Sequence, residues 1–294
     1  MTEIFSFYST TPNQGKRTLS HSFAQLLAQN KFSVLYVELD TLHPSIYAST
    51  QITNPQKNVV EYFHETINRN NFNVEPFILN HEILSYTDNR QLKRIYAEIP
   101  NNLDYLTLPE NFNINSFPNL FDETLENPEN EAHEYIQKFI YSLRTSKYSY
   151  VILNLPNDIQ NIFGFEIIEG SDQILNITTA SPSRLDENKK IVNYLNLNIS
   201  GLEDKWSTVI NMTSPYIEEH TFSNLIKEEP FIIPYDPERQ NLELSLENGS
   251  PVINERLERL ALKLNIVIEP TPQKKKLAFS LFGKGQKNEE STQI

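Results

Sequence analysis

Short runs of apolar residues alternate with segments of helical periodicity along most of this chain. The first apolar run, residues 4–8, leads through a polar turn to Phe23, Leu26 and Leu27, which recur at helical spacing. The same pairing repeats towards the C-terminus. The pattern predicts strands at residues 4–8, 33–39, 103–108, 148–156, 172–178, 206–211 and 230–233, and helices at residues 17–30, 58–68, 132–144, 182–195 and 251–264.

Two of the predicted strands are apolar at almost every position. Residues 34–37 and 151–153 have no polar alternation, which is typical of strands buried on both faces of a parallel sheet. Strands that alternate with helices predict a mostly parallel, twisted sheet flanked by helices on both faces. We expect one α/β domain over residues 1–268, with a polar surface insert at about 110–131 and a flexible tail at 269–294.

Composition narrows the function classes. The chain has 294 residues and a formal net charge of −13, which disfavours binding to nucleic acid through a diffuse basic surface. It has no cysteine, so disulfides and cysteine-ligated metals are excluded. The six histidines lack metal-binding spacing, and we expect no metal site built by protein side chains. A strand at the very start and the lack of a long apolar run predict a cytoplasmic protein without a signal peptide.

The turn after the first strand holds the main candidate site. A helix N-terminus attracts phosphate, Gly15 lets the backbone approach a ligand, and Lys16 would add a full positive charge. Taken by itself, however, this turn favours a solvated lysine in the first turn of a helix. Glu38 and Asp40 end the second strand, where ligands bind in parallel sheets, although a pair of solvated loop acids fits the sequence equally well.

The order of these motifs resembles the MinD/ParA family of deviant P-loop ATPases. The resemblance implies a P-loop NTPase-like fold and ATP as the ligand. Residues 11–17, Thr-Pro-Asn-Gln-Gly-Lys-Arg, stand where the family has Lys-Gly-Gly-x-Gly-Lys-Thr. The resemblance implies that Gly15, Lys16, Arg17 and Thr18 lie at the phosphates. It also implies that Lys16 and Asp40 are the catalytic residues.

Later positions match the family's base-binding segments. Asn211 corresponds to the asparagine that contacts the purine, and Pro234 and Asp236 correspond to the proline and acid on the adenine side. Residues 249–253, Gly-Ser-Pro-Val-Ile, then resemble the family's Gly-x-Pro-Val/Ile.

Three departures from the family bear on activity. Thr11 replaces the lysine that reaches the partner subunit's nucleotide, Arg17 replaces the magnesium-binding threonine, and Asn154 replaces an acid on the metal side. Phosphoryl transfer depends on positioning and on charge neutralisation by metal and lysine. We therefore expect hydrolysis to be slow or absent, and magnesium binding is in doubt. Nucleotide binding could persist or be lost with it.

A basic, apolar segment closes the chain at residues 273–285. Leu277 and Leu281 lie one helical turn apart, as do Ala278 and Phe282. Such a segment suits an anionic membrane surface and resembles the membrane-targeting helix of MinD, although a disordered tail is the alternative. The predicted membrane-binding residues are Lys274, Lys275, Lys276, Leu277, Phe279, Leu281, Phe282 and Lys284.

Three functions follow from these expectations. The first is a peripheral inner-membrane organiser that recruits a protein of a division, pilus, flagellar or secretion assembly, with little or no ATP hydrolysis. The second is an active ATPase that switches between monomer and dimer, and the third is a DNA partitioning factor. The resemblance implies a homodimer, and the acidic composition disfavours a nucleic-acid partner.

Overall fold

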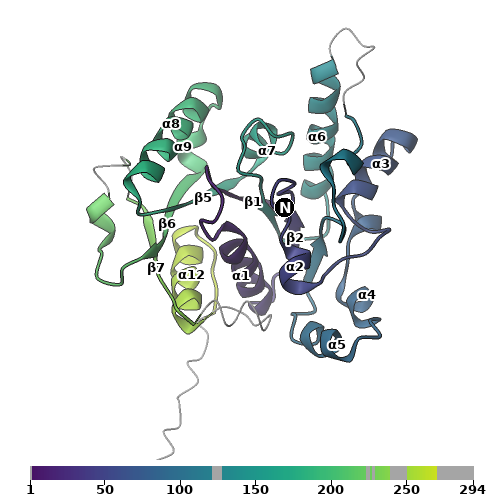
Figure 1. Cartoon of the computed structure of the whole chain (residues 1–294), viewed down its shortest axis with the longest axis horizontal. Helices are drawn as coiled ribbons and strands as arrows, with labels where there is room; N and C mark the ends of the chain where they lie inside the picture. Colours follow the sequence, from purple (N-terminus) through teal and green to yellow (C-terminus); the bar gives the residue numbers. More distant parts are fainter. Residues whose placement is uncertain (1, 121–127, 223–225, 227–228, 239–249, 270–294) are drawn as a thin grey trace, which may run out of the picture.

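A seven-stranded parallel sheet forms the centre of the molecule (Figure 1). The computed structural model describes residues 2–120, 128–222, 226, 229–238 and 250–269. The strand order is β3-β2-β4-β1-β5-β6-β7, and each pairing is parallel. The strands are β1 (Glu3–Tyr8), β2 (Val34–Glu38), β3 (Leu103–Leu106), β4 (Tyr150–Asn154), β5 (Gln173–Thr179), β6 (Trp206–Thr213) and β7 (Phe231–Pro234).

Side chains of β1 show why the sheet is covered on both sides. Phe5 and Phe7 belong to one hydrophobic core, whereas Ile4 and Tyr8 belong to the other, because successive strand residues point to opposite faces. The first core is covered by α1 (Lys16–Gln29), α2 (Ile46–Thr50), α4 (His81–Ser85), α5 (Arg90–Tyr96) and α12 (Pro251–Lys263). The second is covered by α3 (Val59–Arg69), α6 (Pro128–Arg144), α7 (Phe165–Gly170), α8 (Pro182–Asn198) and α9 (Leu202–Lys205).

The direction of the crossover connections switches between the adjacent strands β1 and β4. The chain leaves β1 towards β2, but it leaves the neighbouring β4 towards β5 on the other side. Connections that diverge from adjacent strands open a crevice at the carboxyl end of the sheet, and this is where α/β proteins bind ligands. The predicted α/β fold, with its parallel sheet and two helical layers, is confirmed.

Several boundaries differ from the predicted ones. Helix α6 begins at Pro128, so the predicted surface insert at 110–131 is partly helical, and a short 3-10 turn occupies Ile114–Ser116. Helices α4 and α5 were not predicted, because five and seven residues are too few to display a helical period. The side-chain oxygens of their N-cap residues, Asn80 and Asn89, accept hydrogen bonds from backbone N–H groups of the first turn.

The predicted membrane-binding residues, 274–284, lie outside the described residues. Within the described part, no helix is both long enough and apolar enough to cross a bilayer.

Candidate nucleotide-binding site

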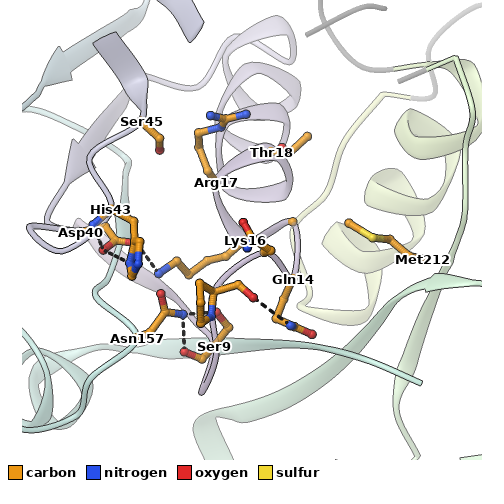
Figure 2. Close-up of a pocket in the computed structure, with 13 residues that line it drawn as sticks. Ser9, Gln14, Lys16, Arg17, Thr18, Asp40, His43, Ser45, Asn157 and Met212 are labelled. Carbon is orange, nitrogen blue, oxygen red and sulfur yellow. Dashed lines mark hydrogen bonds and ion pairs between the residues drawn. The ribbon is translucent and has the colours of Figure 1, made fainter. Parts of the chain in front are cut away.

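A cavity of about 350 Å³ lies at the carboxyl edge of the sheet, at the junction of β1 and α1 (Figure 2). Its wall comes from the turn between β1 and α1, the first residues of α1, the segment after β2, Asn157 beyond β4 and Met212 on β6. The predicted residues Gly15, Lys16, Arg17, Thr18 and Asp40 all line it. The sheet therefore brings together groups that are far apart in the sequence.

Gly15 is held in a conformation that favours glycine. Its φ is +82°, and a Cβ added there would lie 2.3 Å from Nδ2 of Asn211. The same Nδ2 donates a hydrogen bond to the carbonyl oxygen of Gln14 at 2.8 Å. Asn211, predicted as a purine contact, thus packs behind the turn and fixes its backbone, and it does not line the cavity.

Asn157 stabilises the first half of the turn, at Ser9 and Thr11, through hydrogen bonds. Its Nδ2 donates to the carbonyl oxygens of Ser9 at 2.7 Å and Thr11 at 2.9 Å, and it lies 2.6 Å from Ser9 Oγ. Figure 2 shows Asn157 and Ser9 facing each other at the base of the cavity. These bonds and the Asn211 bond hold both ends of the turn, so its shape is set by two distant asparagines.

Lys16 is buried and ion-paired. Its Nζ lies 2.9 Å from Oδ2 of Asp40 and also donates to the carbonyl oxygen of Leu155. The two charged side chains are 6% and 5% exposed. Burial lowers the pKa of Lys16, and the negative charge of Asp40 opposes that shift. The interpretation of Lys16 as a solvated surface lysine is therefore wrong.

Glu38 and Asp40 are also buried, so their interpretation as solvated loop acids is wrong. Asp40 Oδ1 accepts the backbone N–H of His43 at 3.0 Å. Glu38 Oε1 accepts the backbone N–H groups of Ser45 at 2.7 Å and Ile46 at 2.8 Å, at the start of α2. Burial raises the pKa of Glu38 to about 7, although these two backbone donors favour the charged form.

Other predicted positions lie apart from the cavity. Pro234 ends β7 at the same edge of the sheet, and Asp236 follows it, with Oδ1 accepting the N–H of Glu238 at 3.0 Å. Neither lines the cavity. Asn154 is fully buried beside β1 and β2, and its side-chain nitrogen and oxygen have no hydrogen-bond partner in the described structure. It also lies outside the cavity wall.

The sequence analysis missed wall residues outside the 11–17 motif, namely Ser9, His43, Ser45, Asn157 and Met212. Asn157 could have been found, because it directly follows the strand predicted at 148–156 and the carboxyl ends of adjacent parallel strands meet at one edge. Met212 had no such signal. It has a φ of +57° at an irregularity in the β6–β7 pairing, which no local pattern announces.

Comparisons with known proteins bear on the fold. No protein-family model matches the sequence, and no curated protein matches it either. Among solved structures, a ParA-family ATPase from Chlorobium tepidum has a TM-score of 0.63 at 16% identity, covering 88% of this chain and 98% of that one. The septum site-determining protein MinD of Pyrococcus horikoshii, complexed with Mg-ADP, has a TM-score of 0.63 at 15% identity, covering 90% and 98%.

A plasmid partition protein from Borrelia burgdorferi, bound to AMPPNP, is similar at a TM-score of 0.61 and 17% identity, covering 90% of this chain and all of that one. At such identities the similarity establishes the fold. The chain therefore has the fold of the MinD and ParA ATPases over most of its length, as its motif order indicated.

Proposed function

We propose that this protein binds ATP in the cavity at the β1–α1 junction and hydrolyses it slowly or not at all. One observation carries the proposal. A glycine with positive φ precedes a buried lysine at the start of a helix, and both line a cavity of about 350 Å³. The helix N-terminus, the close backbone approach at Gly15 and the charge of Lys16 suit the phosphates of a nucleotide.

Binding of a phosphate chain would exchange the partners of Lys16. Its ammonium group now contacts Asp40 and a backbone carbonyl, and phosphate oxygens would offer it several stronger acceptors. Asp40 would then lose its counter-ion while keeping the N–H bond from His43. A carboxylate released in this way is suited to orient a water molecule near the terminal phosphate. The buried pair therefore couples ligand binding to the state of Asp40.

The expected slow turnover follows from three departures from the motif pattern that this sequence resembles. Arg17 and Asn154 stand where a metal-binding hydroxyl and a carboxylate would assist phosphoryl transfer, and Thr11 stands where a lysine would reach across a dimer. Removing one group that stabilises transition-state charge costs about 100- to 1000-fold in rate where it has been measured. Three such losses are consistent with a nucleotide-binding scaffold.

Two assays on the full chain test this function. A fluorescent ATP analogue is titrated into the protein, and phosphate release is followed over hours. We expect saturable binding that is lost in Lys16→Ala, together with little phosphate release. Lys189→Ala is a matched control, because Lys189 lies on α8, away from the β1–α1 cavity. Absence of binding would refute the proposal. Turnover at typical ATPase rates would favour the alternative, an active ATPase switch.

We further propose that residues 273–285 hold the protein at an anionic membrane surface, where it recruits a protein partner. The support is the sequence pattern of lysines around one apolar face. Each lysine close to such a surface contributes about 1 kcal/mol, so a dimer would bind more firmly than a monomer. The proposal includes a homodimer, and the fold similarity to MinD is consistent with it.

Vesicle co-sedimentation tests the membrane role. The full chain is expected to sediment with vesicles that contain anionic lipid and to stay in solution with neutral vesicles. A chain ending at residue 269 and a Leu281→Ser/Phe282→Ser variant should both stay in solution, and the double variant keeps the lysines. Equal sedimentation of the truncated chain would refute this role. A salt-dependent DNA shift would favour the partitioning alternative, against which the net charge of −13 argues.

A further inference from the structure

The described wall of the cavity offers magnesium one carboxylate and the hydroxyls of Ser9, Thr18 and Ser45, of which Ser9 Oγ donates to the Thr11 carbonyl and Ser45 Oγ to Glu38. This ion prefers carboxylate, hydroxyl, water and phosphate oxygens. Asp40 is the one carboxylate among the described wall residues, and it already binds Lys16 and the N–H of His43. Glu38 accepts backbone N–H groups at the start of α2 and lies outside the wall. Once a phosphate chain has drawn Lys16 away, Asp40 is the single carboxylate that the described wall offers to a metal.

Positive charge is already present on the same wall. Lys16 and Arg17 are consecutive in the first turn of α1, and both line the cavity. Figure 2 shows Lys16 extended towards Asp40 and His43, and Arg17 leaving the same turn on the side of Ser45. With Lys16, Arg17 and Asp40 as its charged residues, the described wall carries a formal charge of +1 if His43 is neutral. Such a wall attracts phosphate and repels a divalent cation.

Asn154 removes the remaining electrostatic support for a metal. It is 0% exposed, both of its polar side-chain atoms lack partners in the described structure, and it is neutral. A carboxylate at this place would add a second negative charge between β1 and β2. The amide adds no charge, so Asp40 is the one acid of the described wall beside Lys16 and Arg17, while Glu38 acts on Lys16 from outside the wall. The charge of the wall itself favours an anion.

We propose that this cavity binds the phosphates of ATP without a divalent cation, and that Arg17 supplies the charge that a metal would otherwise supply. A guanidinium group is always charged and donates to two phosphate oxygens at once, which a lysine or a threonine does not do. The inference rests on the proposed nucleotide binding and adds that the binding is independent of magnesium. Arg17 acts here as a binding residue, and no step of hydrolysis is assigned to it.

Titration of the full chain with a fluorescent ATP analogue, once in magnesium and once in EDTA, tests the inference. We expect nearly equal affinities. In EDTA, Arg17→Thr should bind about tenfold more weakly, and Arg17→Lys should retain more affinity than Arg17→Thr. Adding magnesium should restore part of the affinity of Arg17→Thr, since that variant regains a hydroxyl at the metal position. Arg94→Thr, an exposed arginine on α5, is the matched control and should change nothing.

The outcomes separate this inference from the proposed function. Binding that occurs in magnesium and disappears in EDTA would overturn metal independence and leave nucleotide binding intact. If Thr18→Val then removed the magnesium-dependent binding, Thr18 would be the metal ligand and the role given to Arg17 would be wrong. Absence of binding in both buffers would refute the proposed function itself. Circular dichroism of each variant is the control for retention of the fold.

Discussion

Replacing Gly15 by alanine tests how the turn at the cavity is built. The substitution forces a Cβ into a residue with φ of +82°, which costs about 1–2 kcal/mol for an L-amino acid. The Cβ would also meet Asn211 Nδ2 at 2.3 Å, well inside any real contact distance. Overpacking of this kind costs about 1–3 kcal/mol. We expect Gly15→Ala to lower the free energy of unfolding by the sum of both terms.

Gly201 provides the matched control. Its φ is +70°, but a Cβ there would meet no atom within 4 Å. Gly201→Ala therefore carries the backbone cost and the same change in unfolded-state entropy, without the clash. The difference between the two alanine variants, measured by urea unfolding, isolates the contacts of the new Cβ with Asn211 and, at 3.2 Å, with Met212 Cε. We expect that difference to be about 1–3 kcal/mol.

A double-mutant cycle completes the argument. Asn211→Ala removes the 2.8 Å bond to the Gln14 carbonyl, which we expect to cost about 1–3 kcal/mol because a buried acceptor loses its donor. In Gly15→Ala/Asn211→Ala the clash with Asn211 is gone, so the total cost should fall short of the sum of the single variants by about 1–3 kcal/mol. Additivity within about 0.5 kcal/mol would refute the packing that the structure assigns to these two residues.

Further predictions concern the charged groups and the fastening of the turn. Lys16→Met should lower the unfolding free energy by about 3–5 kcal/mol, because Asp40 then stays buried without its counter-ion, and Lys16→Met/Asp40→Asn should recover part of this loss in urea titrations. Burial raises the pKa of Glu38 from 4.5 to about 7, so the folded state keeps a proton that the unfolded state releases, and stability present below pH 4.5 is lost as pH rises through 7. The unfolding free energy of Glu38→Gln relative to wild type should therefore rise across this window, by about 3 kcal/mol at most, and a flat difference would contradict the buried position of the carboxyl. Asn157→Ala, which loses three contacts to the turn, should weaken binding of the fluorescent ATP analogue about tenfold, whereas the exposed control Asn198→Ala should not.

The strands and long helices of this protein could be predicted because their signals are local. Continuous apolar runs mark strands buried on both faces, and 13- to 17-residue helices such as α1, α8 and α12 show several turns of periodicity. The short helices α4 and α5 could not be recognised by period. Their capping asparagines were present in the sequence, but asparagine is so frequent in this chain that it marks no single position.

The site was predicted to the extent that it depends on chain order. Gly15, Lys16 and Asp40 meet because a strand–turn–helix unit and the end of the next parallel strand place them at one edge. The burial of Lys16 could not be inferred, since it depends on the Leu155 carbonyl, 139 residues away. The Asn211–Gln14 bond spans 197 residues. A turn with only one glycine keeps its shape through such distant hydrogen bonds. Residues 11–17 taken alone therefore predicted the site only weakly, because the residues that hold the turn lie elsewhere in the chain.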